Sequence, residues 1–69
     1  MNRIGIILKE KGIKQVWLAD KLDKSYNMVN SYVRNVRQPS VRDLYNISQI
    51  LKVDVRLLLE STTKYEETN

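Results

Sequence analysis

The stretch that decides the fold runs from Gln15 to Tyr32, and its centre is Ser25-Tyr26-Asn27-Met28-Val29-Asn30-Ser31-Tyr32. Upstream of that centre, QVWLADKL (residues 15–22) is expected to form one helix. Its apolar side chains at helical spacing fall on one face: Leu18, Ala19 and Leu22. Asp23 and Lys24 then interrupt the pattern. The stretch therefore predicts two short helices joined by a turn.

The second of these helices is expected to run from Tyr26 to about Arg34, with Ser25 as its N-cap. Val29 and Tyr32 lie three residues apart and would pack inward. The side chains left pointing outward are Tyr26, Asn27, Asn30 and Ser31, and residues 26–33 carry no charge. Amides, a hydroxyl and a phenol can form hydrogen bonds with base edges, so this face suits a helix in a DNA major groove. An ordinary helical hairpin with a polar face is the alternative that this spacing leaves open.

The pattern continues into the middle of the chain through these positions: Gln15, Leu18, Ala19, Leu22, Ser25, Val29, Tyr32, Gln38, Pro39, Ser40, Leu44 and Ile47. This pattern resembles the lambda-repressor-like helix-turn-helix domain of the Xre/Cro family, over about Ile4 to Leu59. The resemblance implies an all-α, compact five-helix domain with its helix-turn-helix at the second and third helices. It also implies sequence-specific binding of double-stranded DNA. We expect this domain to occupy residues 1–60.

The composition argues against other classes of function, such as enzymes and membrane proteins. A chain of 69 residues allows one small domain, and one Pro with two Gly favours helices. The sequence has no His and no Cys, and it lacks a Gly-rich phosphate loop or a metal-ligand cluster. We therefore expect no enzyme activity, no cofactor and no metal. No apolar run approaches the ~20 residues of a membrane span, and the start lacks a signal peptide, so we expect a cytoplasmic protein.

The charge is uneven along the chain. The formal net charge is +4, yet residues 1–40 hold eight Lys or Arg against three Asp or Glu. The excess of positive charge therefore lies in the half that holds the two central helices. Such a distribution is typical of a phosphate-binding face, although a basic surface without a partner would have the same composition.

The first helix is expected over Asn2 to Lys11, with Asn2 as its N-cap and Gly12 as its stop. Its inward stripe would be Ile4, Ile7 and Leu8. In the resembled family, the position of Leu8 is often an Arg that pairs with an acid at the position of Val33. Both residues are apolar here, so we predict that a Leu8–Val33 contact replaces the ion pair.

The second half of the chain should complete the scaffold. Ser40 and Asp43 have the spacing of a capping box for a fourth helix that runs to about Lys52. Asp54 would cap a fifth helix over residues 55–60, in which Leu58 enters the core. Residues 61–69 are polar without an apolar period, and we expect them to be a flexible tail.

The resemblance also implies roles for single residues. The side chains placed to read bases are Tyr26, Asn27 and Ser31, with Asn30 beside them. Asn27 is the strongest candidate, because an Asn can contact adenine through two hydrogen bonds. The candidates for the DNA phosphates are Lys14, Gln15, Lys24, Arg34, Arg37 and Gln38.

The fifth helix carries more leucine than one inward face can use. Leu57, together with Ile50 or Tyr45, would leave an apolar surface, and such surfaces often mark interaction sites. A homodimer fits best, because it would place two reading helices about one DNA turn (~34 Å) apart on a pseudo-palindrome. The alternative is an antitoxin that captures a toxin protein through the same leucines and also binds DNA.

Overall fold

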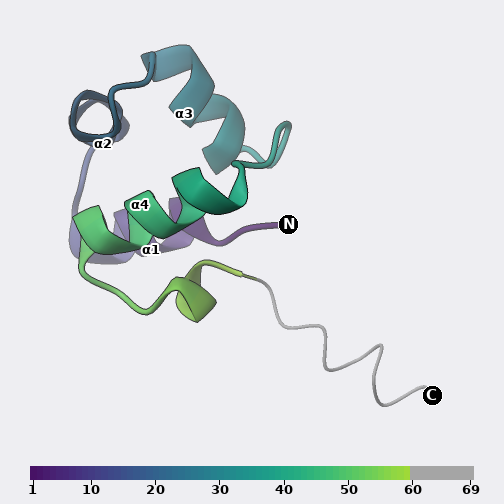
Figure 1. Cartoon of the computed structure of the whole chain (residues 1–69). Helices are drawn as coiled ribbons and strands as arrows, with labels where there is room; N and C mark the ends of the chain where they lie inside the picture. The colour runs from purple at the N-terminus through teal and green to yellow at the C-terminus, as the bar shows by residue number, and fades with distance from the viewer. Residues whose placement is uncertain (60–69) are drawn as a thin grey trace.

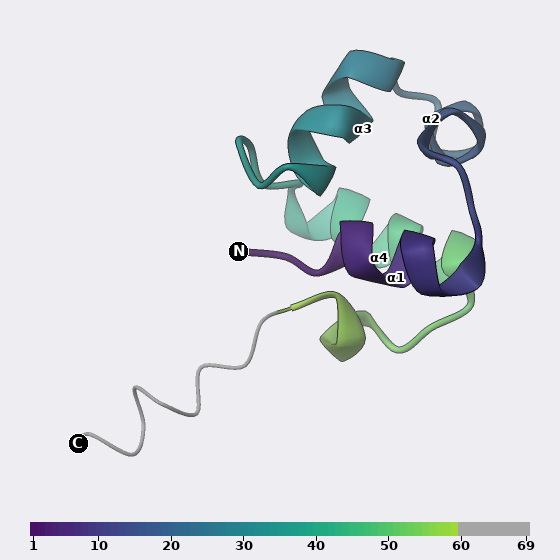
Figure 2. The same cartoon turned by 180° about the vertical axis from the view of Figure 1, so that it is seen from behind.

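The helices of this chain are short and follow the apolar periodicity of the sequence. The computed structural model describes residues 1–59, and the tail expected over residues 61–69 lies outside this part. Four α-helices precede a 3-10 turn: α1 (Ile4–Lys11), α2 (Gln15–Leu22), α3 (Tyr26–Val33), α4 (Val41–Leu51) and η1 (Val55–Leu58). Figure 1 shows α3 and η1 at opposite ends of the domain, and Figure 2 shows the same separation from behind. Among residues 1–59, no helix is long and apolar enough to cross a membrane.

One hydrophobic core receives side chains from all five elements. The buried apolar residues are Ile4, Ile7, Leu8, Leu18, Ala19, Leu22, Val29, Tyr32, Ile47, Leu51 and Leu58. The inward faces predicted for the first three helices are confirmed, as is the burial of Leu58. Burial of these side chains stabilises helices that are too short to form alone in water.

Local signals at the helix ends agree with the sequence in three places. Gly12 ends α1 in the left-handed conformation, with φ of 68°. The Ser25 hydroxyl caps α3 by accepting the N–H of Met28 at 3.1 Å. The Asp54 carboxylate caps η1 by accepting the N–H of Arg56 at 2.9 Å. The starts of α3 and η1 are therefore fixed by the N-cap residue that directly precedes each of them.

The prediction of a fifth α-helix over residues 55–60 was wrong in type. The N–H of Leu57 donates to the carbonyl of Asp54 at 2.9 Å, which is the tighter 3-10 spacing, and η1 ends at Leu58. Leu59 is already extended and pairs with Asn2 in an isolated antiparallel bridge. The chain thus leaves the 3-10 helix where it pairs with the N-terminal segment, and the carbonyl of Leu58 accepts the N–H of Arg3 at 2.8 Å.

The same bridge corrects the start of the first helix, which we predicted at Asn2. Helix α1 begins at Ile4, and the N–H of Arg3 donates to the carbonyl of Leu58 at 2.8 Å. Asn2 still helps the helix start, because its Oδ1 accepts the N–H of Ile4 at 2.9 Å. Its backbone, however, belongs to the contact with the C-terminal segment.

Candidate nucleic-acid interface

The outward face of α3 is polar and uncharged. Tyr26 is 50% exposed and Asn27 is exposed as well, whereas Asn30 and Ser31 are half-buried. All four predicted base-reading residues therefore lie on the surface of one helix. The two at its N-terminal end are the more accessible pair.

The opposite face of α3 fixes how that helix sits. Val29 and Tyr32 are buried and point into the core. Helix α2 packs against α3, and Ala19 lies buried on the α2 side, where its small side chain allows the two helices a close approach. Asp23 takes the left-handed conformation at the end of α2, with φ of 58°, and so lets the chain turn. The result is a pair of short packed helices whose second member presents residues 26–31.

The hydroxyl of Ser31 already donates a hydrogen bond within α3. Its Oγ donates to the carbonyl oxygen of Met28 at 2.6 Å, one turn earlier in the same helix. The hydroxyl proton is therefore engaged, and the oxygen keeps its lone pairs for a donor such as an exocyclic amino group of a base.

The loop after α3 folds back onto the helix. Asn35 adopts the left-handed conformation with φ of 59°, and the N–H groups of Val36 and Arg37 both donate to the carbonyl of Ser31, at 3.0 and 3.2 Å. Nη1 of Arg37 lies 3.8 Å from Sδ of Met28, which places the guanidinium over the helix. Arg34 and Arg37 are both exposed, and neither forms a salt bridge within residues 1–59.

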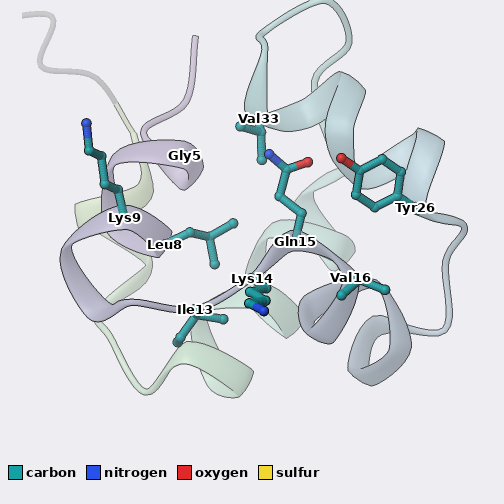
Figure 3. Close-up of a pocket in the computed structure, with 9 residues that line it drawn as sticks. All are labelled: Gly5, Leu8, Lys9, Ile13, Lys14, Gln15, Val16, Tyr26 and Val33. Atoms are coloured by element: carbon teal, nitrogen blue, oxygen red, sulfur yellow. The ribbon is translucent and has the colours of Figure 1, made fainter.

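The start of α2 lies beside the start of α3. Lys14 is exposed at the N-cap position and makes no side-chain cap. Gln15 and Tyr26 line one open hollow of about 440 Å³, together with residues of α1 and α3. In Figure 3 the Gln15 amide and the Tyr26 hydroxyl point toward one another, with Val33 and Leu8 nearby.

The orientation of the Gln15 amide affects the role predicted for it. Its Oε1 is buried and has no hydrogen-bond partner among residues 1–59. A phosphate oxygen needs a donor, so a phosphate contact from Gln15 would have to use its Nε2. Leu8 and Val33, for which we predicted a contact, both line this same hollow.

Lys24 and Asp43 form an ion pair that the sequence did not reveal. Nζ of Lys24 lies 3.3 Å from Oδ2 of Asp43, and the Tyr32 hydroxyl donates to the same oxygen at 3.4 Å. Burial of Tyr32, followed by the nearby negative charge of Asp43, raises the pKa of the Tyr32 hydroxyl. Ser40 does cap α4 by accepting the N–H of Asp43 at 3.1 Å.

The capping-box prediction was therefore only half right. The Asp43 carboxylate holds the α2–α3 turn and the buried tyrosine instead of reaching back to Ser40. Lys24, predicted to bind phosphate, would have to do so through the Nζ donors that this pair leaves free.

Gln38 is also engaged within the chain. Its Oε1 accepts from Nδ2 of Asn2 at 2.9 Å, and its Nε2 donates to Oδ1 of Asn35 at 3.1 Å. Asn2 is buried, and its Nδ2 also donates to the carbonyl of Tyr32 at 3.0 Å, at the end of α3. These contacts hold the chain around residue 38 against the end of the reading helix, so the role of Gln38 here is first of all structural.

Two groups of exposed apolar side chains lie elsewhere on the surface. Tyr45 of α4 and Leu57 of η1 are exposed and Ile50 is half-buried, on two elements that pack together. Leu59 is 46% exposed and adjoins them in sequence, and our sequence reasoning missed it because it placed this residue inside a helix. On α2, Trp17 is 43% exposed, with Nζ of Lys21 5.5 Å from its ring centroid.

Residues 1–59 contain no group of three or more His, Cys, Asp or Glu side chains placed to hold a metal ion. The polar side chains that do gather lie on α3, at the start of α2 and in the loop after α3. This arrangement offers donors, acceptors and unpaired cations on one part of the described surface.

Comparison with known proteins agrees with this arrangement. Residues 4–58 match the model of a helix-turn-helix family. A search of curated proteins found no match. Among solved structures, the chain is similar to a Bacteroides fragilis protein described as a candidate DNA-binding protein, at 38% identity and a TM-score of 0.83, covering 84% of this chain and 94% of that one.

A second similar structure is the N-terminal DNA-binding domain of SinR from Bacillus subtilis. It is 34% identical, with a TM-score of 0.72, and the match covers 87% of this chain and 88% of that domain. The family match spans nearly all described residues, and both structural matches extend over most of each chain. The chain belongs to the lambda-repressor-like helix-turn-helix family of DNA-binding proteins.

Proposed function

We propose that the chain is a transcriptional regulator of the repressor type that binds a pseudo-palindromic operator as a homodimer. The observation that carries this proposal is the uncharged face of α3, on which Tyr26 and Asn27 are exposed while Val29 and Tyr32 anchor the helix from behind. A helix held in this way can enter a major groove without rearrangement. Bound at a promoter, the dimer would block transcription by occupying the DNA.

Within this function, Tyr26, Asn27 and Ser31 contact base edges, and Asn30 flanks them. Cations that are unpaired within the described residues surround this face, from the start of α2 and the end of α3: Lys14, Arg34 and Arg37. They fix the register on the phosphates but carry no sequence information. Gln15 joins them through its Nε2, while Lys24 and Gln38 contribute through the donors that their internal contacts leave free.

The dimer would form through the surface of Tyr45, Ile50 and Leu57. The exposed Leu57 supports it, because it lies with the exposed Tyr45 on two elements that pack together, and grouped apolar side chains mark interaction sites more often than scattered ones do. The same surface fits an antitoxin that captures a toxin protein and regulates its own operon. Co-expression with a neighbouring toxin gene would separate the two functions, since an antitoxin forms a stable heterocomplex.

The test of DNA reading is selection of bound sequences from random duplexes, followed by two variants. Asn27→Ala should weaken binding to the selected operator by about 1–3 kcal/mol and leave binding to random DNA unchanged, because it removes hydrogen bonds to a base. Arg37→Ala should weaken binding to both DNAs and lower the slope of log K against log salt by about one, because one phosphate is no longer neutralised. Titrations of both DNAs at several salt concentrations measure these effects.

An equal loss of affinity for operator and random DNA in Asn27→Ala would contradict the base-reading role. A selection that enriches no sequence would contradict the proposed function as a whole.

A further inference from the structure

A second, smaller hollow lies directly beside the reading face of α3. It has a volume of about 270 Å³ and is lined by Ser25, Asn27, Met28, Ser31, Val36 and Arg37. Its lining residues thus come from the N-cap and first turns of α3 and from the loop that follows the helix. It contains the strongest candidate for base reading, Asn27, and one of the cations unpaired among residues 1–59, Arg37.

The apolar part of this hollow is Met28 and Val36. Met28 is half-buried against the core, whereas Val36 is 70% exposed. The position of Val36 is nevertheless fixed, because its N–H and that of Arg37 both donate to the carbonyl of Ser31. A valine side chain also has few rotamers, so its methyl groups are held where the backbone places them.

Nothing in the core explains the exposed methyl groups of Val36. In the proposed function they lie on the surface that meets DNA. The one apolar group that a base pair offers in the major groove is the 5-methyl group of thymine. A bare polar base edge would lose hydrogen bonds to water against Met28 and Val36, whereas a methyl group would lose none.

We propose that Met28 and Val36 form a seat for the 5-methyl group of one thymine in each operator half-site. The remaining lining residues suit the surroundings of such a base. Asn27 can contact the adjoining base, and the guanidinium of Arg37, which lies over Sδ of Met28 at 3.8 Å, has further donors for the neighbouring phosphate. No acidic side chain lines the hollow, so nothing in it repels the DNA backbone. This inference rests on the proposed function and adds a base preference to it.

The experiment uses the full chain and the selected operator. Each thymine of the half-site is replaced in turn by deoxyuridine, symmetrically in both halves, which removes only the 5-methyl group and keeps base pairing. One replacement should weaken binding about fourfold per half-site, the effect of one methyl group returned to water. Val36→Ala should weaken binding to the thymine operator by a similar factor and reduce the penalty at that position, leaving only the contact with Met28.

Val55→Ala is the control, because it removes the same two methyl groups from a half-buried valine of η1, at the end of the domain opposite α3 (Figure 1). It should leave the deoxyuridine penalty unchanged. The proposal is overturned if no deoxyuridine replacement weakens binding, or if the penalty is equally large in Val36→Ala, which would point to another contact such as the Tyr26 ring. A selected half-site without thymine would overturn it as well. Failure of the selection to enrich any sequence would instead contradict the proposed function on which it rests.

Discussion

Asn2 shows how a single side chain can hold distant parts of a small domain together. Its side chain bonds to the start of α1, to the end of α3 and to Gln38, and its backbone N–H donates to Oδ1 of Asn35 at 2.8 Å. Asn35 in turn donates through Nδ2 to the carbonyl of Asn2 at 3.2 Å. Each asparagine therefore satisfies backbone or side-chain groups of the other, in a largely buried place where unmet groups are costly.

Asn2→Ala should lower the free energy of unfolding by about 2–3 kcal/mol, because it leaves buried backbone groups without partners. Asn35→Gly removes the side chain that holds both backbone groups of Asn2, but glycine suits the left-handed conformation of residue 35, so its cost should be smaller, about 1–2 kcal/mol. Urea unfolding of both variants measures the two values. A cost below about 0.5 kcal/mol for Asn2→Ala would contradict the structural role of its side chain, whose partners are Ile4, Tyr32 and Gln38.

At the scale of elements, the reading helix is held by its contacts with α2 and α4. Tyr32 reaches from α3 to Asp43 of α4, and Lys24 reaches the same carboxylate from the turn before α3. One carboxylate thus joins both ends of the reading helix to α4. Loss of the Asp43 carboxylate should therefore make the position of α3 relative to α4 less fixed.

The raised pKa of Tyr32 makes this link sensitive to alkali. Because the folded state holds the proton more tightly than the unfolded state, the stability it contributes is complete below the unfolded pKa near 10 and is lost as the pH rises further. The free energy of unfolding of the native chain should therefore fall more steeply above about pH 10 than that of Tyr32→Phe. At pH 7 the variant should cost about 0.5–1.5 kcal/mol.

Denaturant titrations at several pH values measure both effects. The difference between the two curves isolates the contribution of the Tyr32 hydroxyl. Parallel curves would show that the Tyr32 proton is not linked to folding.

Most of the scaffold could be predicted from the sequence because its signals are local. Apolar spacing placed the core residues of α1 to α3, and Ser25, Ser40 and Asp54 marked helix starts by residue type alone. The uncharged outward face of α3 could be predicted for the same reason, because helical spacing alone separates it from the buried face.

What could not be predicted depends on residues far apart in the chain. Asn2 and Asn35 are separated by 33 positions, and neither carries a local sign of the other. The ion pair between Lys24 and Asp43 is a second example. Lys24 was predicted to bind phosphate and Asp43 to complete a capping box, and nothing local in the sequence indicates that the two would pair. The last helix is shorter than predicted, and the residue after it, Leu59, forms a bridge with the distant Asn2.

At the scale of the whole molecule, the reading helix and the proposed dimer surface are well separated. Helix α3 lies at one end of the domain and η1 at the other (Figures 1 and 2). Dimerisation through η1 would therefore leave α3 uncovered, and each protomer could still read its own half-site.

Leu57→Ser should weaken the dimer at least about tenfold, because a two-fold interface loses two leucine side chains and full burial of each is worth about 1.5–3 kcal/mol. Folding should be little affected, since Leu57 is 47% exposed. Light scattering over a range of concentrations measures the dissociation constant. Trp17→Ser is the control: it removes an apolar side chain of similar exposure from α2. If only Trp17→Ser weakens the dimer, the interface lies on α2 instead.

The close contact of α1 with α3 has a consequence for how recognition can change. A Cβ added to Gly5 would lie 2.9 Å from Cγ1 of Val33, so even alanine at position 5 would push against the last turn of α3. A substitution there touches no base, yet it requires a shift of Val33, which lies in the reading helix itself. Screens for altered operator preference should therefore vary position 5 alongside the residues that face DNA.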